Sequence, residues 1–105
     1  KERSILYELA NSSMLWDNRI AVVSTLHFIR KHDFNDIFKL SKIFLNHKHD
    51  LIHKATGWML REVWVKSPTK VERFLDEHFS KMPRTMLRYT IEKMPNEKRL
   101  EYLKK

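Results

Sequence analysis

Cysteine is absent from this sequence, and glycine and proline are scarce: its 105 residues include one glycine and three prolines. The absence of cysteine excludes disulfides, thiolate zinc sites and cysteine nucleophiles, and is compatible with a reducing compartment. One glycine, Gly57, excludes the glycine-rich loops that hold nucleotide phosphates, because those turns need several glycines. With 42% hydrophobic residues, the chain also lacks the composition of a disordered segment or of a many-turned β-sandwich. These absences favour a compact helical protein.

Long hydrophobic runs are missing as well. The apolar stretches fall far short of the ~20 residues that span a bilayer, and no signal-peptide pattern is present, so we expect a cytoplasmic protein without membrane association. Positive charge, in contrast, is abundant. The 21 Lys and Arg residues against 13 Asp and Glu give a formal net charge of +8, which favours an anionic partner such as nucleic acid.

Apolar residues recur at helical spacing between short polar breaks, as with Leu15, Val22 and Ile29. Several of these segments have a start signal. Asp50 is a suitable N-cap, and Pro68, Pro83 and Pro95 each lie at or just before the first turn of a predicted helix. The predicted helices span residues 2–10, 15–31, 34–46, 51–66, 68–81, 84–94 and 96–104.

Similar short segments open the second helix of successive pairs, with Arg19, Lys54 and Arg84 35 and 30 residues apart. This period predicts an all-α fold, a solenoid of αα-hairpin (HEAT-like or ARM-like) repeats with three helix pairs and a C-terminal helix. A plain helical bundle is the alternative. Because the chain starts at Lys1 inside a helical pattern, we interpret residues 1–105 as a single helical region that forms the C-terminal part of a larger domain.

The three cations near helix starts oppose the helix dipole, so they favour phosphate sites along one face; solvated helix ends are the simpler explanation. The densest signal is Lys54, Trp58 and Arg61, which lie on one stripe of a helix. A tryptophan between two cations can pack on a base or sugar while the cations hold phosphates, or it can simply belong to the core. Gly57 beside it indicates close approach of another backbone, from the protein or from a ligand.

Two further sets of residues invite a chemical interpretation. Asp17 could stabilise a cationic sugar, but an acid in the first helical turn needs no such role. His47, His49 and His53 lack the glutamate of a zinc helix and have no nearby cysteine. We therefore expect no metal and no cofactor.

Three segments resemble a known family. Residues 51–62 (LIHKATGWMLRE) are similar to the I-x-K-A-x-G-W-x-L-R-E signature of AlkD-type DNA alkylation repair proteins, and residues 16–24 (WDNRIAVVS) to that family's W-x-x-R-x-A segment. Residues 82–93 resemble the M-P-R-T-x-L-R-Y-x-I-E-K segment of one branch. The resemblance implies a stack of HEAT-like repeats that cradles duplex DNA, and a DNA glycosylase that excises N3- and N7-alkylated purines without flipping the base into a deep pocket.

Carried over by motif, Arg19 would clamp a phosphate and Trp58 would lie at the lesion. Lys54 and Arg61 would add to the DNA-facing surface, together with Arg84 and Arg88. The family's catalytic aspartate belongs to a W-D-x-V-D-like segment that this sequence lacks, and Asp17 does not match it.

The chain alone is therefore expected to be a monomer that binds alkylated double-stranded DNA near the nucleoid and releases no base. A non-enzymatic helical-repeat protein that binds nucleic acid or acts as a scaffold is the alternative function.

Overall fold

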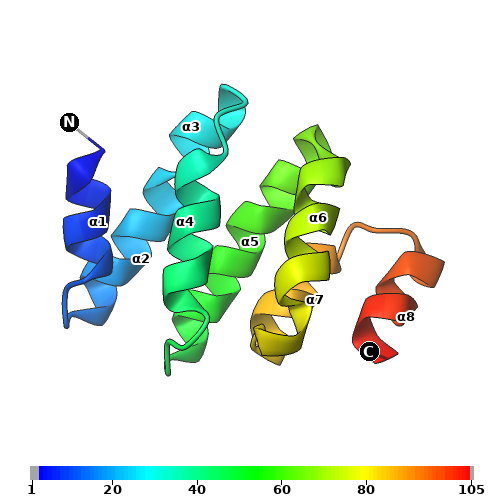
Figure 1. Cartoon of the computed structure of the whole chain (residues 1–105). Helices are drawn as coiled ribbons and strands as arrows, with labels where there is room; N and C mark the ends of the chain where they lie inside the picture. Colours follow the sequence, from blue (N-terminus) through cyan, green and yellow to red (C-terminus); the bar gives the residue numbers. More distant parts are fainter. Residues whose placement is uncertain (1–2, 105) are drawn as a thin grey trace.

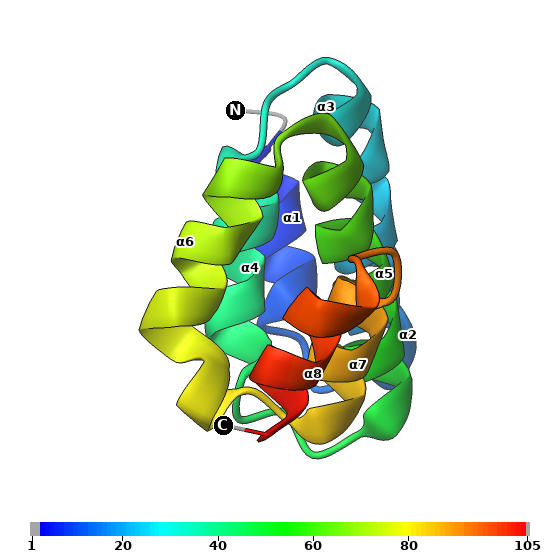
Figure 2. The ribbon, with the colours of Figure 1, turned by 90° about the vertical axis from the view of Figure 1, so that its right-hand side faces the viewer.

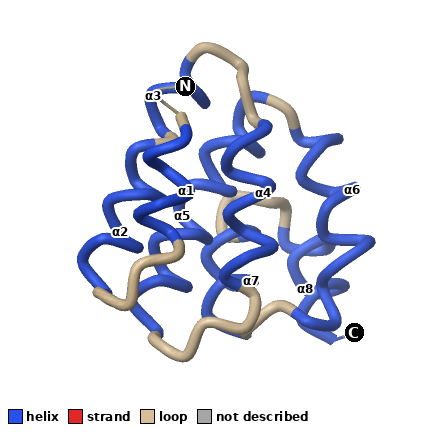
Figure 3. The backbone as a smooth tube through the Cα atoms, turned by 60° about the vertical axis from the view of Figure 1, so that its left-hand side comes forward, coloured by secondary structure: helices blue, strands red, loops and turns tan. Residues whose placement is uncertain are grey.

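The computed structural model describes residues 3–104, which form helices joined by short loops (Figure 1). The elements are α1 (Ser4–Ala10), α2 (Leu15–Ser24), α3 (Leu26–Arg30), α4 (Asn35–Phe44), α5 (Asp50–Lys66), α6 (Pro68–His78), the 3₁₀ turn η1 (Phe79–Lys81), α7 (Arg84–Ile91) and α8 (Asn96–Lys104). Residues 3–104 contain helices and loops and no strand (Figure 3). The prediction of an all-α helical repeat fold is confirmed.

The helices form two layers. Helices α1, α4 and α6 lie side by side in one layer, and α2, α5 and α7 lie in the other, so that each first-layer helix pairs with the second-layer helix that follows it (Figures 1 and 2). Helix α8 closes the end of the stack against α6, where the Tyr102 hydroxyl donates to Asp76 at 3.3 Å and Lys98 pairs with Glu72 at 2.9 Å. Residues 3–104 thus contain three helix pairs and a C-terminal helix, as the repeat spacing predicted, and the short α3 follows α2 and contacts α5.

Helix α5 is the centre of the core and packs against α2, α4, α6 and α7. Its inward residues Ile52, Met59, Leu60 and Val63 are fully buried. Burial of a side chain of this size contributes about 1.5–3 kcal/mol relative to exposure, so this helix fixes how the two layers sit on each other. None of the helices within residues 3–104 has the length and apolar character of a membrane span.

Gly57 lies where α5 crosses α7. A Cβ atom on Gly57 would lie 2.5 Å from the Cβ of Tyr89 and 2.7 Å from the carbonyl oxygen of Met86. Both distances are below van der Waals contact. The glycine therefore allows α7 to approach α5, and of the two explanations that the sequence left open, close approach of the protein's own backbone is correct.

Several predicted helix boundaries differ from the structure. The helix expected over residues 15–31 is interrupted at Thr25, whose hydroxyl donates to the carbonyl of Val22 at 2.6 Å. Thr25 thereby competes with the backbone for that acceptor, as threonine does at helix ends. The helix expected to start after Asp50 already includes Asp50, because His49 is the N-cap and its ring accepts from the N–H of Leu51 at 3.4 Å.

The ends of other predicted helices are shorter than the apolar pattern suggested. The segment expected as helix over 68–81 is α-helical only to His78 and tightens into the 3₁₀ turn η1. The segments expected over 34–46 and 84–94 end at Phe44 and Ile91. Last turns often fray or tighten in this way because their carbonyls have no helical partner.

Candidate nucleic-acid interface

The surface formed by α2, α5, α7 and α8 carries three neighbouring hollows. The first has a volume of about 250 Å³ and is lined by Arg19, Leu51, Lys54, Ala55, Trp58, Arg61 and Tyr89. The second, of about 260 Å³, is lined by Arg61, Arg88, Tyr89 and Glu92. The third, of about 190 Å³, is lined by Arg88, Ile91, Arg99 and Leu103. Because neighbouring hollows share residues, they form one continuous surface, which we call the basic groove.

The cations of the basic groove occupy equivalent places in successive helices. Arg19 is the fifth residue of α2, Lys54 is the fifth residue of α5 and Arg88 is the fifth residue of α7. Since α2, α5 and α7 lie side by side in one layer (Figure 1), the repeat itself brings these three charges onto one surface. Cations grouped on one surface in this way can neutralise the charges of a polyanion.

Arg84 lies apart from this set, although the sequence aligned it with Arg19 and Lys54. It is the first residue of α7 and lines none of the three hollows. Its guanidinium donates to the carbonyl of Leu103 at 3.2 Å, near the end of α8. The structure thus assigns Arg84 a contact between α7 and the C-terminal helix, and it makes Arg88 the equivalent residue of the third pair.

The stripe on α5 supplies the middle of the basic groove. Lys54 is exposed, whereas Trp58 and Arg61 are half-buried, and Trp58 packs against the hydrophobic core with part of its indole. Arg61 forms an ion pair with Glu92, the residue that follows the end of α7, and its Nε atom is buried without a hydrogen-bond partner. The stripe therefore combines an exposed cation (Lys54), an aromatic side chain (Trp58) and a cation that is ion-paired with a carboxylate (Arg61).

Trp16 flanks the basic groove at the start of α2. Its indole is 63% exposed, and the guanidinium of Arg19 lies 5.7 Å from the ring centre. A cation over an indole face is attracted by the ring quadrupole, by about 0.5–1 kcal/mol at an exposed site. The contact orients Arg19, which is itself half-buried.

These features can be compared with known families. The family model described as DNA alkylation repair enzyme matches residues 1–94 of the chain. The chain belongs to the DNA alkylation repair enzyme family. No curated protein and no solved structure matches it.

Asp17, the one carboxylate that the sequence offered for catalysis, lies in the first turn of α2 of this DNA alkylation repair family member. Its Oδ2 accepts a hydrogen bond of 2.7 Å from the hydroxyl of Ser12, which in turn accepts from the N–H of Met14. Asp17 lines none of the three hollows. Its contacts hold the loop between α1 and α2.

The histidines that suggested a metal site form a hydrogen-bond network between α2 and α5. The Nε2–H of His47 donates to the side-chain oxygen of Asn18 at 3.0 Å, while its Nδ1 accepts from the N–H of His49. His53 Nε2 donates to the carbonyl of His47 at 2.7 Å. Burial and then the nearby His53 and His49 lower the pKa of His47 below its ordinary value. Among residues 3–104 no group of three metal-ligating side chains converges.

Asn18 connects this network to the first helix. Its amide nitrogen donates to the carbonyls of Leu9, Ala10 and Ser12, at 2.9, 3.1 and 3.1 Å. Those carbonyls close the C-terminal end of α1 and its following loop, where helices leave acceptors unpaired. The buried amide therefore fixes α1 against α2, next to Arg19 in the chain.

Sequence reasoning missed several residues of the basic groove. Tyr89, Glu92 and Arg99 line it, and only the first two fall within a family-like motif, residues 82–93. Counting positions from the start of each second-layer helix would have selected Arg88 over Arg84. No pattern in the sequence indicates the pairing of Arg61 with Glu92, because the two residues are far apart in the sequence and meet only in the fold.

Proposed function

We propose that this member of the DNA alkylation repair family is the DNA-binding C-terminal part of a glycosylase that excises N3- or N7-alkylated purines from duplex DNA. The basic groove is the surface that would hold the duplex. Arg19, Lys54 and Arg88 would contact successive backbone phosphates, and Trp58 would lie against the sugar or base at the lesion.

The observation that carries this proposal is the register of the three cations. Each is the fifth residue of a second-layer helix, and the three hollows that they line are continuous. Phosphate contacts position a protein on DNA without reading its sequence. A repair protein that must find a lesion in any sequence context is suited by such a surface.

The shallow form of the basic groove supports a mechanism in which the base is not drawn into the protein. The hollow beside Trp58 has a volume of about 250 Å³ and is open along the surface, while the space next to Gly57 is filled by α7. A purine alkylated at N3 or N7 carries a positive charge, so its glycosidic bond is already weakened. The protein would then need only to stabilise the developing charge on the sugar, which is an electrostatic task.

Among the residues that line the three hollows, the one carboxylate, Glu92, is not free for that task. Glu92 lines the basic groove but is ion-paired with Arg61, and Asp17 is hydrogen-bonded to Ser12 away from it. In the proposal the catalytic aspartate comes from a further segment of a longer protein, as the family resemblance implies. The 105-residue chain binds DNA but does not release bases.

Salt dependence of DNA affinity tests the binding part of the proposal. Replacing a phosphate-binding cation should reduce the slope of log K against log salt by about one unit. We expect this result for Arg19→Ala with a fluorescent duplex, and an unchanged slope for Arg30→Ala, an exposed cation on α3 that lines none of the hollows. Equal slopes for Arg19→Ala and the wild type would remove Arg19 from the interface.

A non-enzymatic DNA-binding or scaffold role is the second candidate, and the paired state of Asp17 and Glu92 favours it for the chain alone. Measuring the release of 7-methylguanine from alkylated duplex DNA separates the two. Release by a longer protein that contains this chain, and none by the 105 residues, supports the glycosylase. Release by the 105 residues, abolished in Asp17→Asn, would show that Asp17 is catalytic.

A further inference from the structure

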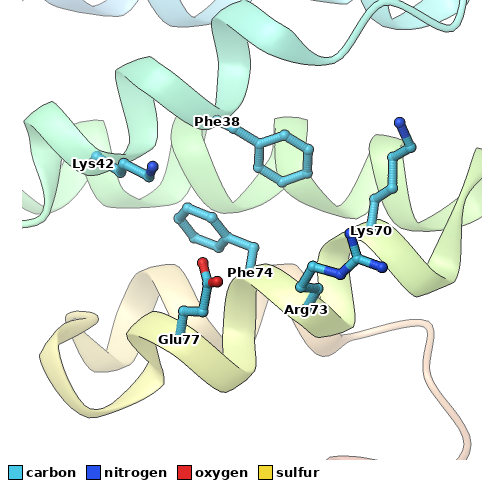
Figure 4. A pocket seen from close by; sticks show the side chains of 6 residues that line it. All are labelled: Phe38, Lys42, Lys70, Arg73, Phe74 and Glu77. Carbon is cyan, nitrogen blue, oxygen red and sulfur yellow. The ribbon is translucent and has the colours of Figure 1, made fainter.

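A second groove lies on the opposite face of the stack, between α4 and α6 of the first layer. It has a volume of about 260 Å³ and is lined by Phe38, Lys42, Lys70, Arg73, Phe74 and Glu77 (Figure 4). A hollow of about 420 Å³ continues it toward the N-terminal ends of both helices, lined by His32, Asp33, Phe34, Asn35, Phe38 and Lys70. We call the two together the α4–α6 groove.

The middle of the α4–α6 groove is aromatic. The rings of Phe38 and Phe74 face each other across the two helices, with centroids 5.3 Å apart and planes inclined by 31° (Figure 4). Phe74 is 5% exposed and forms the floor, while Phe38 is half-buried and presents part of its ring to solvent. The groove therefore offers one apolar anchor point rather than a row of stacking platforms.

Charged side chains flank the rings on both sides. Lys70 and Arg73 lie on one side of the ring pair, and Lys42 and Glu77 lie on the other, on facing helices (Figure 4). Within residues 3–104, Lys42, Lys70 and Arg73 have no carboxylate at ion-pair distance. Lys70 lies instead over the ring of Phe34, at 5.8 Å. Three unpaired cations around an apolar centre are complementary to a partner that carries acidic and apolar side chains together.

The lining distinguishes an acidic peptide from a nucleic acid. Surfaces that bind single strands combine a uniformly cationic path with several exposed aromatic platforms, whereas Phe34 and Phe74 of this groove are buried and Phe38 alone among its phenylalanines is accessible. The exposed carboxylate of Glu77 lies in the lining, where it would repel a phosphodiester backbone but can accept an N–H group or pair with a basic residue of a peptide. A groove between two packed helices is also a form in which proteins bind amphipathic segments.

We propose that the α4–α6 groove is a docking site for an acidic segment of a partner protein, in which an apolar side chain packs on Phe38 and carboxylates pair with Lys42, Lys70 and Arg73. The α4–α6 groove is lined from one layer, whereas most of the basic groove is lined from α2, α5 and α7 of the other layer (Figure 2). A peptide in the first therefore leaves the second free, and the chain can hold a partner and DNA at the same time. The inference does not depend on glycosylase activity.

The test uses the full chain and a short fluorescein-labelled peptide of Asp and Glu that contains one Phe and one Leu, followed by fluorescence anisotropy. We expect saturable binding that weakens roughly tenfold or more in Lys70→Glu/Arg73→Glu. The matched control Lys48→Glu/Lys81→Glu makes the same change in net charge at exposed residues that line neither groove. It should weaken binding far less. A peptide with Ser in place of Phe and Leu should also bind more weakly.

Further arms separate the possible occupants. Duplex DNA should not displace the peptide, and Arg19→Ala should leave peptide affinity unchanged. Equal weakening by the two double variants would show attraction to net charge alone and would overturn the proposal. Tighter binding of an oligothymidylate than of the peptide, lost in Lys70→Glu/Arg73→Glu, would assign the groove to single-stranded nucleic acid and would overturn it as well, as would full competition by inorganic phosphate.

Discussion

The two layers of the stack carry charge in different ways. On the α2, α5 and α7 surface, Arg19, Lys54 and Arg88 recur at the same position of successive helices and line one continuous groove. On the α4 and α6 surface, cations and Glu77 surround a single aromatic pair. The first arrangement follows the repeat and suits a repeating anion. The second arrangement is confined to one place between two helices. The positive charges of the chain thus lie on two surfaces of different form.

The layers also differ in how tightly their helices are joined. Helix α5 meets α7 at Gly57, where no Cβ atom fits, whereas α4 meets α6 through the rings of Phe38 and Phe74. A backbone contact leaves the spacing of α5 and α7 little freedom, and this spacing sets the distance between Lys54 and Arg88. Aromatic side chains can repack more easily, as an adaptable docking surface requires.

The largest expected effect comes from breaking the close approach of α5 and α7. Gly57→Ala places a methyl group 2.5 Å from the Cβ of Tyr89. We expect this overpacking to exceed the gain in helix propensity and to lower the free energy of unfolding by roughly 1–3 kcal/mol. Urea denaturation measures the change. Ser24→Ala, at an exposed residue of α2, should stay within about 0.5 kcal/mol of the wild type.

Gly57→Ala also separates the two surfaces. In the fraction that remains folded, affinity for duplex DNA should fall because α7 is displaced, while affinity of the α4–α6 groove for an acidic peptide should be unchanged. A variant as stable as the wild type would contradict the importance of this contact.

A smaller effect is expected from releasing Arg61. Glu92→Gln removes the ion pair with Arg61 and one negative charge from the basic groove. Exposed ion pairs are worth about 0.2–1 kcal/mol, so affinity for duplex DNA should rise by up to about fivefold. Glu97→Gln, which changes the same charge on α8 at a residue that lines none of the hollows, is the control. An equal gain in both variants would indicate a general effect of net charge.

Acid should weaken the two layers in different pH ranges. His47 links α2 to α5 with Nδ1 as an acceptor, and its pKa lies below the ordinary 6.5. Above 6.5 the ring is neutral in both states and its contribution is complete. As the pH falls below 6.5 the unfolded state takes up the proton first, so stability decreases until the folded pKa is passed.

Asp33 pairs with Arg3 at 2.5 Å, and the hydrogen bond from Arg3 lowers the pKa of Asp33 below 3.8. Its contribution is complete above 3.8 and is lost only as the pH falls through the lower folded value. We therefore expect a small loss of stability below pH 6.5 that His47→Gln abolishes, and a separate loss in stronger acid that Asp33→Asn abolishes. Urea denaturation over a pH series detects both, and His27→Gln should leave both unchanged.

The sequence predicted the fold well because its start and stop signals are strong. Proline at 68, 83 and 95 precedes or opens a helix in the structure as expected, and the apolar periodicity placed α5 correctly within one residue. It failed at Thr25, where a side-chain bond to Val22 ends α2. The apolar residues on both sides of Thr25 keep helical spacing, so their pattern gives no sign of a hydrogen bond that ends the helix there.

The candidate interface was predictable in part. Motif and spacing selected Arg19, Lys54, Trp58 and Arg61, and the structure brings these four together in one hollow. Arg84 was matched by its distance along the chain, although the predicted starts of these helices, which the structure reproduces within one residue, already put Arg84 at the first position of its helix and not at the position of Arg19 and Lys54. The ion pair of Arg61 and the α4–α6 groove arise from contacts between helices far apart in sequence, so neither was visible without the fold.

The central claim is that the repeat places a phosphate-binding row on one layer only. The most direct test compares two triple variants of equal charge, Arg19→Ala/Lys54→Ala/Arg88→Ala and Lys42→Ala/Lys70→Ala/Arg73→Ala, in duplex DNA binding across a salt series. We predict that the first lowers the slope of log K against log salt by about three units and that the second leaves it within about one unit of the wild type. Equal losses of slope in the two triple variants would contradict the account.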